Sequence, residues 1–279
     1  MEGGVTGSAG ILYVVSTPIG NMGDFSFRAV ETLRSVAAVL AEDTRHTRHL
    51  LDRYEIDVPL VAYHEHNVAK TMPGLVARLL GGESLALVSD AGTPLLSDPG
   101  ARLVRAAAEA EVRVSPLPGA SALLAALVAS GLDLDRFTFF GFLARKGSER
   151  RAAVADVVGS AHVVVLYEAA NRVAATLAEL AGAGAGDRAT VVARELTKQH
   201  EELRRGTVTE LAAYYERTPP RGEVVIVIAG RTPEAPNEDE LRARATALRA
   251  EGRSARDVAA ALSAEFGAPR NVAYRLAHE

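Results

Sequence analysis

The 279 residues, 48% hydrophobic and 24% charged, fit a globular protein of two packed domains, and the lack of cysteine excludes disulfides, iron–sulfur clusters, thiolate zinc sites and cysteine nucleophiles. A formal net charge of −4 gives no overall attraction to nucleic acid, so any RNA contact must come from local basic patches. No apolar run approaches the roughly 18–20 residues of a membrane span, and the N-terminus lacks the regions of a secretory signal, so we expect a cytoplasmic protein without membrane contact.

The first half of the chain repeats one pattern after a flexible tail over residues 1–10. A short apolar run ends in a Gly/Pro turn and passes into a helical pattern, which is typical of β-α units on a parallel sheet. The runs are ILYVVS, VAAVLA, LALV and VRVS, and a small-residue helix follows the last of them at about 121–129. We predict an α/β domain over residues 11–131.

The pattern changes after residue 131. Strands are predicted at HVVVLYE, ATVVARE and GEVVIVIAG, with helices at about 173–180 and 208–215, which gives a second α/β domain over 132–231. AGAGAGD is interpreted as a helix end and loop, because no Lys-Ser/Thr follows it. Residues 232–279 are predicted to form a linker and a small helical module that resembles a helix-turn-helix. That module could contact nucleic acid or serve packing alone.

Three loops, TPIGN, DAGTP and LPGAS, follow predicted strands and combine Gly or Pro with small residues. Parallel sheets gather such loops at one edge, where a ligand can approach exposed backbone amides. We therefore expect one crevice for an extended ligand, although Gly and Pro also punctuate strand ends without binding anything. The Gly-rich fingerprints of NAD-binding and P-loop proteins are absent from the sequence.

The segments TPIGNMGDFSFRA, AEDTRHTRHLL, YHEHN, VSDAGTPLLSDPG, PLPGASA, GFLARKGSERR, VVARELTK and GEVVIVI occur in this order. Together they closely resemble the ribosomal RNA small subunit methyltransferase I family of the tetrapyrrole-methylase-like superfamily, over about residues 12–230. The resemblance implies two unequal α/β domains with a ligand cleft between them. It also implies a homodimer that transfers a methyl group from S-adenosylmethionine to the ribose 2′-hydroxyl of a cytidine in the decoding region of 16S ribosomal RNA, so that the small ribosomal subunit is the partner.

By similarity, residues from both domains contact the cofactor. These are Pro18, Ile19, Gly20, Asp90, Gly92, Thr93, Leu96, Ser121, Ala122, Tyr167, Glu168, Gly222 and Glu223. The chain departs from the family pattern at three places: YEAANR replaces YESPHR, Ala120 precedes Ser121 where the family has Pro, and Leu95 replaces Gly. These changes put local contacts at the pocket rim in doubt, above all any role for a histidine at Asn171.

A ribose hydroxyl is a weak nucleophile, so a general base or a positive group should assist the transfer. We expect Glu42 or Asp43 to act as base or to orient the ribose, and Arg45 to hold a phosphate. The alternative is that Asp43 and Arg45 only cap and pair at a helix start. Further substrate contacts are predicted for two histidines and for basic residues that could equally form solvated faces: His64, His66, Arg145, Lys146, Arg150 and Arg194.

Two histidine pairs, His46 with His49 and His64 with His66, could supply imidazoles to a metal ion. We predict no metal site, because methyl transfer requires no Lewis acid. Two other functions remain as alternatives. One is methylation of a tetrapyrrole or another small molecule, and the other is a non-enzymatic nucleic-acid-binding regulator that would act through the helical tail.

Overall fold

The computed structural model describes residues 8–232 and 237–279. Residues 1–7 of the predicted N-terminal tail lie outside the described residues, and Gly10 is already attached to the fold, since its N–H donates to Leu79 O at 2.8 Å. The chain divides after Gly230 into an α/β unit and a small helical unit. Within the described residues, no helix has the length and apolar character needed to cross a membrane.

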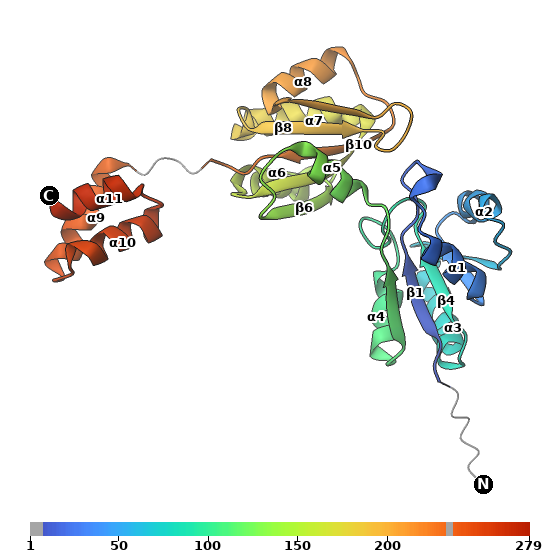
Figure 1. The fold of residues 1–279 in the computed structure, drawn as a ribbon. Helices are drawn as coiled ribbons and strands as arrows, with labels where there is room; N and C mark the ends of the chain where they lie inside the picture. Colours follow the sequence, from blue (N-terminus) through green and yellow to red (C-terminus); the bar gives the residue numbers. More distant parts are fainter. Residues whose placement is uncertain (1–7, 233–236) are drawn as a thin grey trace, which may run out of the picture. The chain divides into compact units, whose positions relative to one another are not determined.

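The first half of the α/β unit, coloured blue to green in Figure 1, is built on a parallel sheet. The sheet has five strands in the order β3-β2-β4-β1-β5. The strands are β1 (Ile11–Val15), β2 (Ala38–Ala41), β3 (Leu60–Ala62), β4 (Leu85–Val88) and β5 (Arg113–Leu117). The parallel β-α architecture predicted from the sequence is confirmed. Because all strands run the same way, the loops that follow them meet at one edge of the sheet.

Helices cover both faces of this sheet, because alternate strand residues point to opposite sides. Val15 and Val39 pack against α1 (Phe27–Ser35) and α2 (Thr44–Arg53). Leu12 and Leu40 pack on the other face, against α3 (Val68–Leu80) and α4 (Ala101–Glu109). The central strands are therefore buried on both sides, which explains their continuous apolar runs. A 3-10 turn, Met22–Asp24, lies between β1 and α1.

The second half is built on a mixed sheet in the order β6-β7-β10-β8-β9, in which only β6 and β7 are parallel. Its strands are β6 (Phe137–Phe142), β7 (Val163–Ala169), β8 (Ala189–Arg194), β9 (Glu202–Thr207) and β10 (Glu223–Ile228). One face is covered by α6 (Gly147–Gly159), α7 (Val173–Leu180) and α8 (Val208–Arg217). Between them lie the turns Ala170–Arg172 and Ala181–Ala185, and the latter kinks at Gly184 (φ 108°).

Helix α5 (Ala122–Ser130) covers the other face of this second sheet. Its Leu123 and Leu127 pack with Val165 and Val225, and Arg205 of β9 donates to Ala129 O at 2.6 Å near the helix end. The boundary drawn at 131/132 from the sequence places α5 with the first domain, whereas its packing places it with the second. The helix follows β5 but buries its apolar side elsewhere, which periodicity alone does not reveal.

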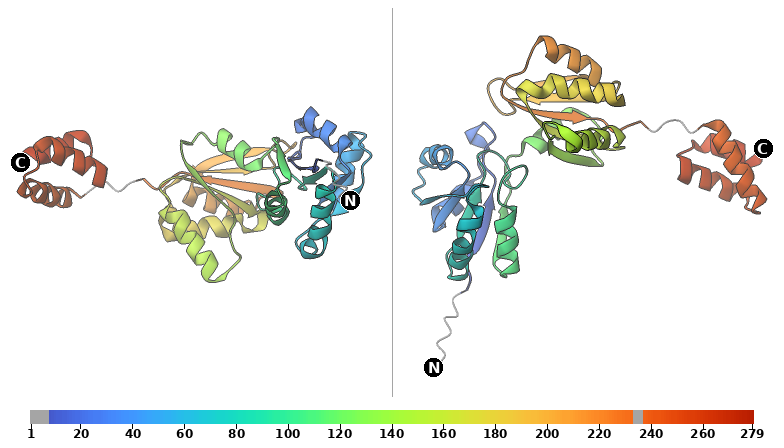
Figure 2. Two further views of the ribbon diagram at one scale, coloured as in Figure 1. Left: turned by 90° about the horizontal axis from the view of Figure 1, so that it is seen from below. Right: turned by 180° about the vertical axis from the view of Figure 1, so that it is seen from behind.

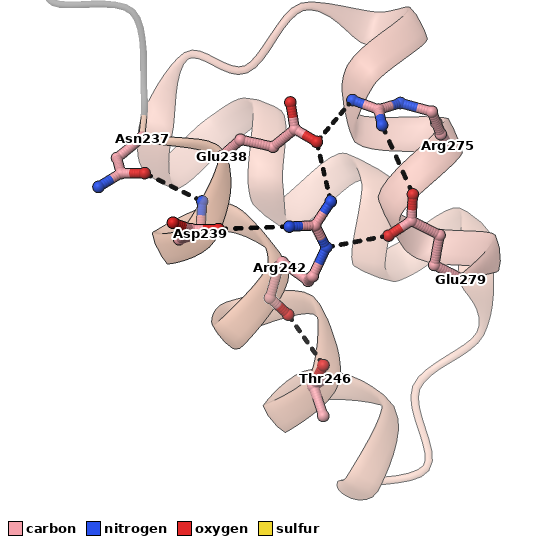
Figure 3. Close-up of polar contacts among 7 residues, drawn as sticks. All are labelled: Asn237, Glu238, Asp239, Arg242, Thr246, Arg275 and Glu279. Carbon is pink, nitrogen blue, oxygen red and sulfur yellow. Dashed lines mark hydrogen bonds and ion pairs between the residues drawn. The ribbon is translucent and has the colours of Figure 1, made fainter.

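The C-terminal unit consists of α9 (Glu238–Ala250), α10 (Ala255–Phe266) and α11 (Arg270–His278), packed as three helices (Figure 2). Ser254 N-caps α10, and Gly267 ends it in the left-handed conformation. Arg242 of α9 pairs with Glu238 and with Glu279, the C-cap residue of α11, while Arg275 pairs with the same two carboxylates (Figure 3). These charges join helices within the module.

Candidate active site

A cavity of about 450 Å³ lies between the two halves of the α/β unit. Its walls come from the loops after β1 and β4, from the start of α5, and from the ends of β6, β7, β8 and β10. A volume in this range is typical of small-molecule sites. The predicted cleft between two α/β domains is therefore present.

Hydrogen bonds tie the three predicted loops together at this cavity. Thr17 and Gly92 exchange backbone bonds of 2.9 and 3.1 Å, which joins TPIGN to DAGTP. Thr93 Oγ1 donates to Ala120 O at 3.2 Å, which joins DAGTP to LPGAS. Gly92 has a φ of 80°, and a Cβ there would lie 3.2 Å from Ile19 Cγ2, so this position favours glycine. The prediction that the loops converge is confirmed.

On the opposite side, the loop between β8 and β9 reaches across to the TPIGN loop. Lys198 Nζ bonds to Glu195 Oε1 at 2.9 Å and to Glu223 Oε2 at 3.0 Å, and its stem lies against Gly20. Thr197 Oγ1 accepts from Asn21 N at 3.2 Å. The bond from Lys198 holds the pKa of Glu195 below its ordinary value. This ion-paired clasp joins both halves of the unit at the cavity rim.

The charged residues that line the cavity, within the part of the chain that the structure describes, are all acidic: Asp90, Asp98, Glu168 and Glu223. Two of them have partners in the structure. Glu168 accepts from Thr176 Oγ1 at 2.6 Å and from Ala169 N at 2.8 Å, and Glu223 pairs with Lys198. A cavity with this lining favours a cationic ligand and disfavours a phosphate.

Asp98 is the charged lining residue that the sequence analysis did not predict. Burial, followed by the negative charges of Glu42 and Asp90, raises its pKa to about 6. Leu95 and Ser97, just before it, have positive φ values of 75° and 71°. Strained backbone of this kind is concentrated at functional sites. The segment LLSDPG carried part of the family resemblance, but nothing in its spacing indicated which residue enters the cavity.

Comparison with known proteins agrees with this architecture. The model of the family "Tetrapyrrole (Corrin/Porphyrin) Methylases" matches residues 11–212. A protein of Synechocystis sp. named "Ribosomal RNA small subunit methyltransferase I" is 46% identical over 97% of this chain and 98% of its own length. One of the same name from Pseudomonas aeruginosa is 44% identical over 97% of each chain. The chain belongs to the ribosomal RNA small subunit methyltransferase I family of tetrapyrrole methylases.

Solved structures support the fold of this methyltransferase family member. A cobalt precorrin-4 methyltransferase has a TM-score of 0.61 at 16% identity and covers 78% of this chain and 94% of its own. A diphthine synthase has a TM-score of 0.59 at 15% identity and covers 78% and 89%. At such low identity the likeness concerns the fold alone. It confirms the predicted tetrapyrrole methylase type of two α/β domains.

Most residues assigned to the cofactor by the family resemblance line the cavity. These are Ile19, Asp90, Gly92, Thr93, Leu96, Ala122, Tyr167, Glu168, Gly222 and Glu223. Pro18, Gly20 and Ser121 lie beside it: Pro18 is buried next to Ile19, Gly20 contacts Lys198, and Ser121 N-caps α5. Their contact with a cofactor remains a prediction, and for Ser121 the cap uses the side chain.

The two acids predicted on the acceptor side, Glu42 and Asp43, have different surroundings in the structure. Asp43 is the N-cap of α2, accepts from Arg45 N at 2.9 Å and pairs with the Arg45 guanidinium at 3.0 Å. These bonds from Arg45 lower the pKa of Asp43 to about 2, which makes it a weak base. The geometry is that of the capping alternative. The pKa of Glu42 is raised by burial and by Asp90, and Glu42 lies within the field of His64.

The two predicted histidines lie together after β3, with His64 and His66 ring centroids 6.1 Å apart. His64 Nδ1 is buried without a hydrogen-bond partner. Across residues 8–232 and 237–279, no group of three or more His, Asp or Glu side chains is arranged to hold a metal ion.

The predicted basic patches differ from the expectation. Arg150 is only 8% exposed and bonds to Glu179, Ala144 O and Thr176, an arrangement that disfavours the RNA contact predicted for it. Arg194 is paired with Glu202 at 3.0 Å, and Arg204 shares the same carboxylate. Arg145 and Lys146 are exposed at the start of α6. A charged run in the sequence does not show which members find partners, because those partners lie up to 29 residues away.

Proposed function

We propose that this chain transfers a methyl group from S-adenosylmethionine to the 2′-hydroxyl of a cytidine in the decoding region of 16S ribosomal RNA. The observation that carries the proposal is the acidic cavity between two tetrapyrrole-methylase halves, in a chain that matches proteins named ribosomal RNA small subunit methyltransferase I over 97% of its length. When bound, the sulfonium donor supplies an electrophilic methyl group.

The residues present fit this donor. S-adenosylmethionine carries a sulfonium and an ammonium, and the charged cavity residues are carboxylates. Ile19, Leu196 and Val225 give the cavity apolar surface for a purine ring. Gly92 and Gly222, both at positive φ, allow close approach to the backbone. A phosphate-bearing cofactor would instead meet like charges.

The chain's own contribution to catalysis is alignment and exclusion of water. In-line methyl transfer gains most of its acceleration from holding hydroxyl, methyl carbon and sulfur in position. The clasp of Lys198 with Glu195 and Glu223 joins the second half to the TPIGN loop and so fixes one wall of the cavity. The paired backbone bonds of Thr17 and Gly92 fix the other.

The acceptor nucleotide enters beside Phe142 in this proposal. Phe142 lines the cavity, is 56% exposed and lies 5.6 Å from the Tyr167 ring. Exposed aromatic rings are common platforms for unstacked RNA bases. Arg145 and Lys146, which come three and four residues after Phe142, are exposed, so they are suited to hold phosphates outside the acidic cavity.

The proposal includes a cytoplasmic homodimer that acts on the small ribosomal subunit. Exposed apolar side chains support a self-association surface: Leu124 and Val128 lie one turn apart on α5, and Phe137 lies on the edge strand β6. Light scattering of the wild type and of Val128→Glu tests this part. The proposal expects a dimer in the first and a monomer in the second, and a monomeric wild type contradicts it.

The deciding experiment incubates the protein with labelled donor and 30S subunits that lack the modification, and maps the product by mass spectrometry. The proposal expects one methylated ribose on a decoding-region cytidine. Label on another RNA position or on a base would reject the assigned acceptor. If the protein binds the donor by calorimetry but transfers no label to 30S subunits, the RNA substrate is rejected and the alternative, methylation of a small molecule, is favoured.

A further inference from the structure

Asp98 is held in the cavity by an unusual stretch of backbone. Leu95 and Ser97 both adopt the left-handed conformation, which costs a non-glycine residue energy. A Cβ on Gly141 of β6 would lie 2.8 Å from Ser97 Oγ, so the loop abuts the second half of the unit. The glycine and the strained loop together place Asp98 between the two halves.

The carboxylate of Asp98 has no cationic partner among the groups that act on it. Asp90 also lacks an ion pair among the described residues, but it accepts a backbone bond from Asp43 N at 3.2 Å. Asp43 is paired with Arg45, Glu168 with Arg172, and Glu223 with Lys198. The charges that act on Asp98 are Glu42 at the end of β2 and Asp90 at the end of β4, both negative, while a bond from Ser89 opposes them. Tyr167 of β7 faces Asp98. Burial and the negative charge of Asp98 raise the pKa of Tyr167, and a bond to the Leu123 backbone opposes this shift.

An unpaired, half-buried carboxylate among like charges lowers stability, so its presence indicates a function, either attraction of the cationic donor or use of its basicity. Removing Asp98 would relieve repulsion, so stability does not explain its presence. Burial and the two negative neighbours raise its pKa to about 6, so it is ionised at neutral pH and yet more basic than an ordinary aspartate.

Resting on the function proposed above, we propose that Asp98 is the general base that takes the proton from the acceptor ribose hydroxyl, and that Glu42 and Asp90 set its basicity. The hydroxyl oxygen forms a bond to the methyl carbon as the carbon–sulfur bond breaks and its electron pair stays on sulfur. The hydroxyl proton passes to Asp98 Oδ and later to water. Asp43, fixed as a helix cap, takes no part in this transfer.

The test compares Asp98→Asn and Asp98→Glu with Asp57→Asn, an exposed acid outside the site. Single-turnover methylation of 30S subunits at saturating donor should fall 10²–10⁴-fold in Asp98→Asn and recover in part in Asp98→Glu. Donor affinity by calorimetry should stay within about threefold, and Asp57→Asn should match the wild type. The wild-type rate should rise with pH and level off above about pH 6.

A readout without donor or RNA completes the test. Carbon-13 titration of the free protein should find the Asp98 carboxyl ionising near pH 6. A rate loss below tenfold in folded Asp98→Asn, loss of donor binding in parallel with rate, or ionisation near pH 4 would each overturn the assignment. Failure of the proposed function is distinguishable, because then the wild type itself would leave 30S ribose unmethylated.

Discussion

Replacing Arg150 by Met separates two interpretations of the ARKGSERR run. If Arg150 contacts RNA, Arg150→Met should fold normally and bind the small subunit more weakly. The structure predicts the opposite, because Arg150 is buried behind the cavity wall. Its guanidinium joins Glu179 to Thr176, and Thr176 donates to Glu168, which lines the cavity.

The expected loss of stability follows from these bonds. Arg150 bonds to Thr176 Oγ1 and Ala144 O, both at 3.0 Å, and pairs with Glu179. Each of the first two contributes about 1 kcal/mol, and the pair about the same, because Glu179 remains 38% exposed and can be hydrated when its partner is lost. Arg150→Met should therefore lower the free energy of unfolding by about 3 kcal/mol, at the lower end of the roughly 3–5 kcal/mol expected for a fully buried pair.

Urea unfolding provides the measurement, and Arg151→Met is the matched control, since Arg151 is the exposed neighbour. For a unit of this size about 3 kcal/mol corresponds to a fall of roughly 6–12 °C in melting temperature. The control should change the free energy of unfolding by less than about 0.5 kcal/mol. The reasoning is refuted if both variants unfold alike while Arg150→Met loses affinity for 30S subunits with a shallower salt dependence.

Three further predictions follow from the geometry of the site. Gly222→Ala should weaken donor binding at least tenfold by calorimetry, because its Cβ would lie 2.2 Å from Glu195 Oε1 and force the clasp open. The control Gly252→Ala, at a similar φ of about 80° but with open space around it, should leave donor binding unchanged, and equal effects of the two variants would contradict a role of the clasp in donor binding. The pKa of Asp98 is about 6 in the folded protein against 3.8 in the unfolded chain, so between these pH values the folded state binds more protons, and the free energy of unfolding should fall by about 1–2 kcal/mol as pH rises, after allowance for solvent screening. Asp98→Asn should lack this fall in urea unfolding measured from pH 4 to 8, and a variant that keeps the fall would show that other groups cause it. Arg145→Gln should weaken 30S binding and lower the salt slope by about 1, with donor affinity unchanged, and an unaltered slope would remove Arg145 from the interface.

The central elements of the fold could be predicted from the sequence because their burial shows in the pattern. The run Leu85–Val88 is apolar throughout and forms β4 with those bounds. The predicted helix at 173–180 is α7, whose buried side follows a helical period. Strand β9 (Glu202–Thr207) was not predicted, because it is an edge strand whose residues are mostly polar. An edge strand buries too little to leave an apolar run.

The parts of the site formed by backbone loops could be predicted from the sequence. The pairing and burial of its charged side chains could not, because these depend on residues distant in the sequence. Glycine and proline mark the three loops, and their convergence follows from the parallel sheet. The pairing of Arg150 and the burial of Asp98 depend on Glu179 and on strand β6, which local sequence does not connect with them. Likewise, Glu42 and Asp43 are adjacent in the sequence, and Asp43 rather than Glu42 is the N-cap because α2 begins at Thr44.

The charge distribution of the site suggests how a protein of net charge −4 could act on RNA. Carboxylates line the cavity, so a phosphate that followed its ribose inside would meet repulsion, whereas a neutral hydroxyl would not. Phosphates would then remain outside, near Arg145 and Lys146. The same negative field stabilises a cationic donor and raises the basicity of Asp98. Asp90→Lys would therefore lower both the affinity for the donor and the pKa of Asp98, while its positive charge would attract RNA phosphates toward the cavity.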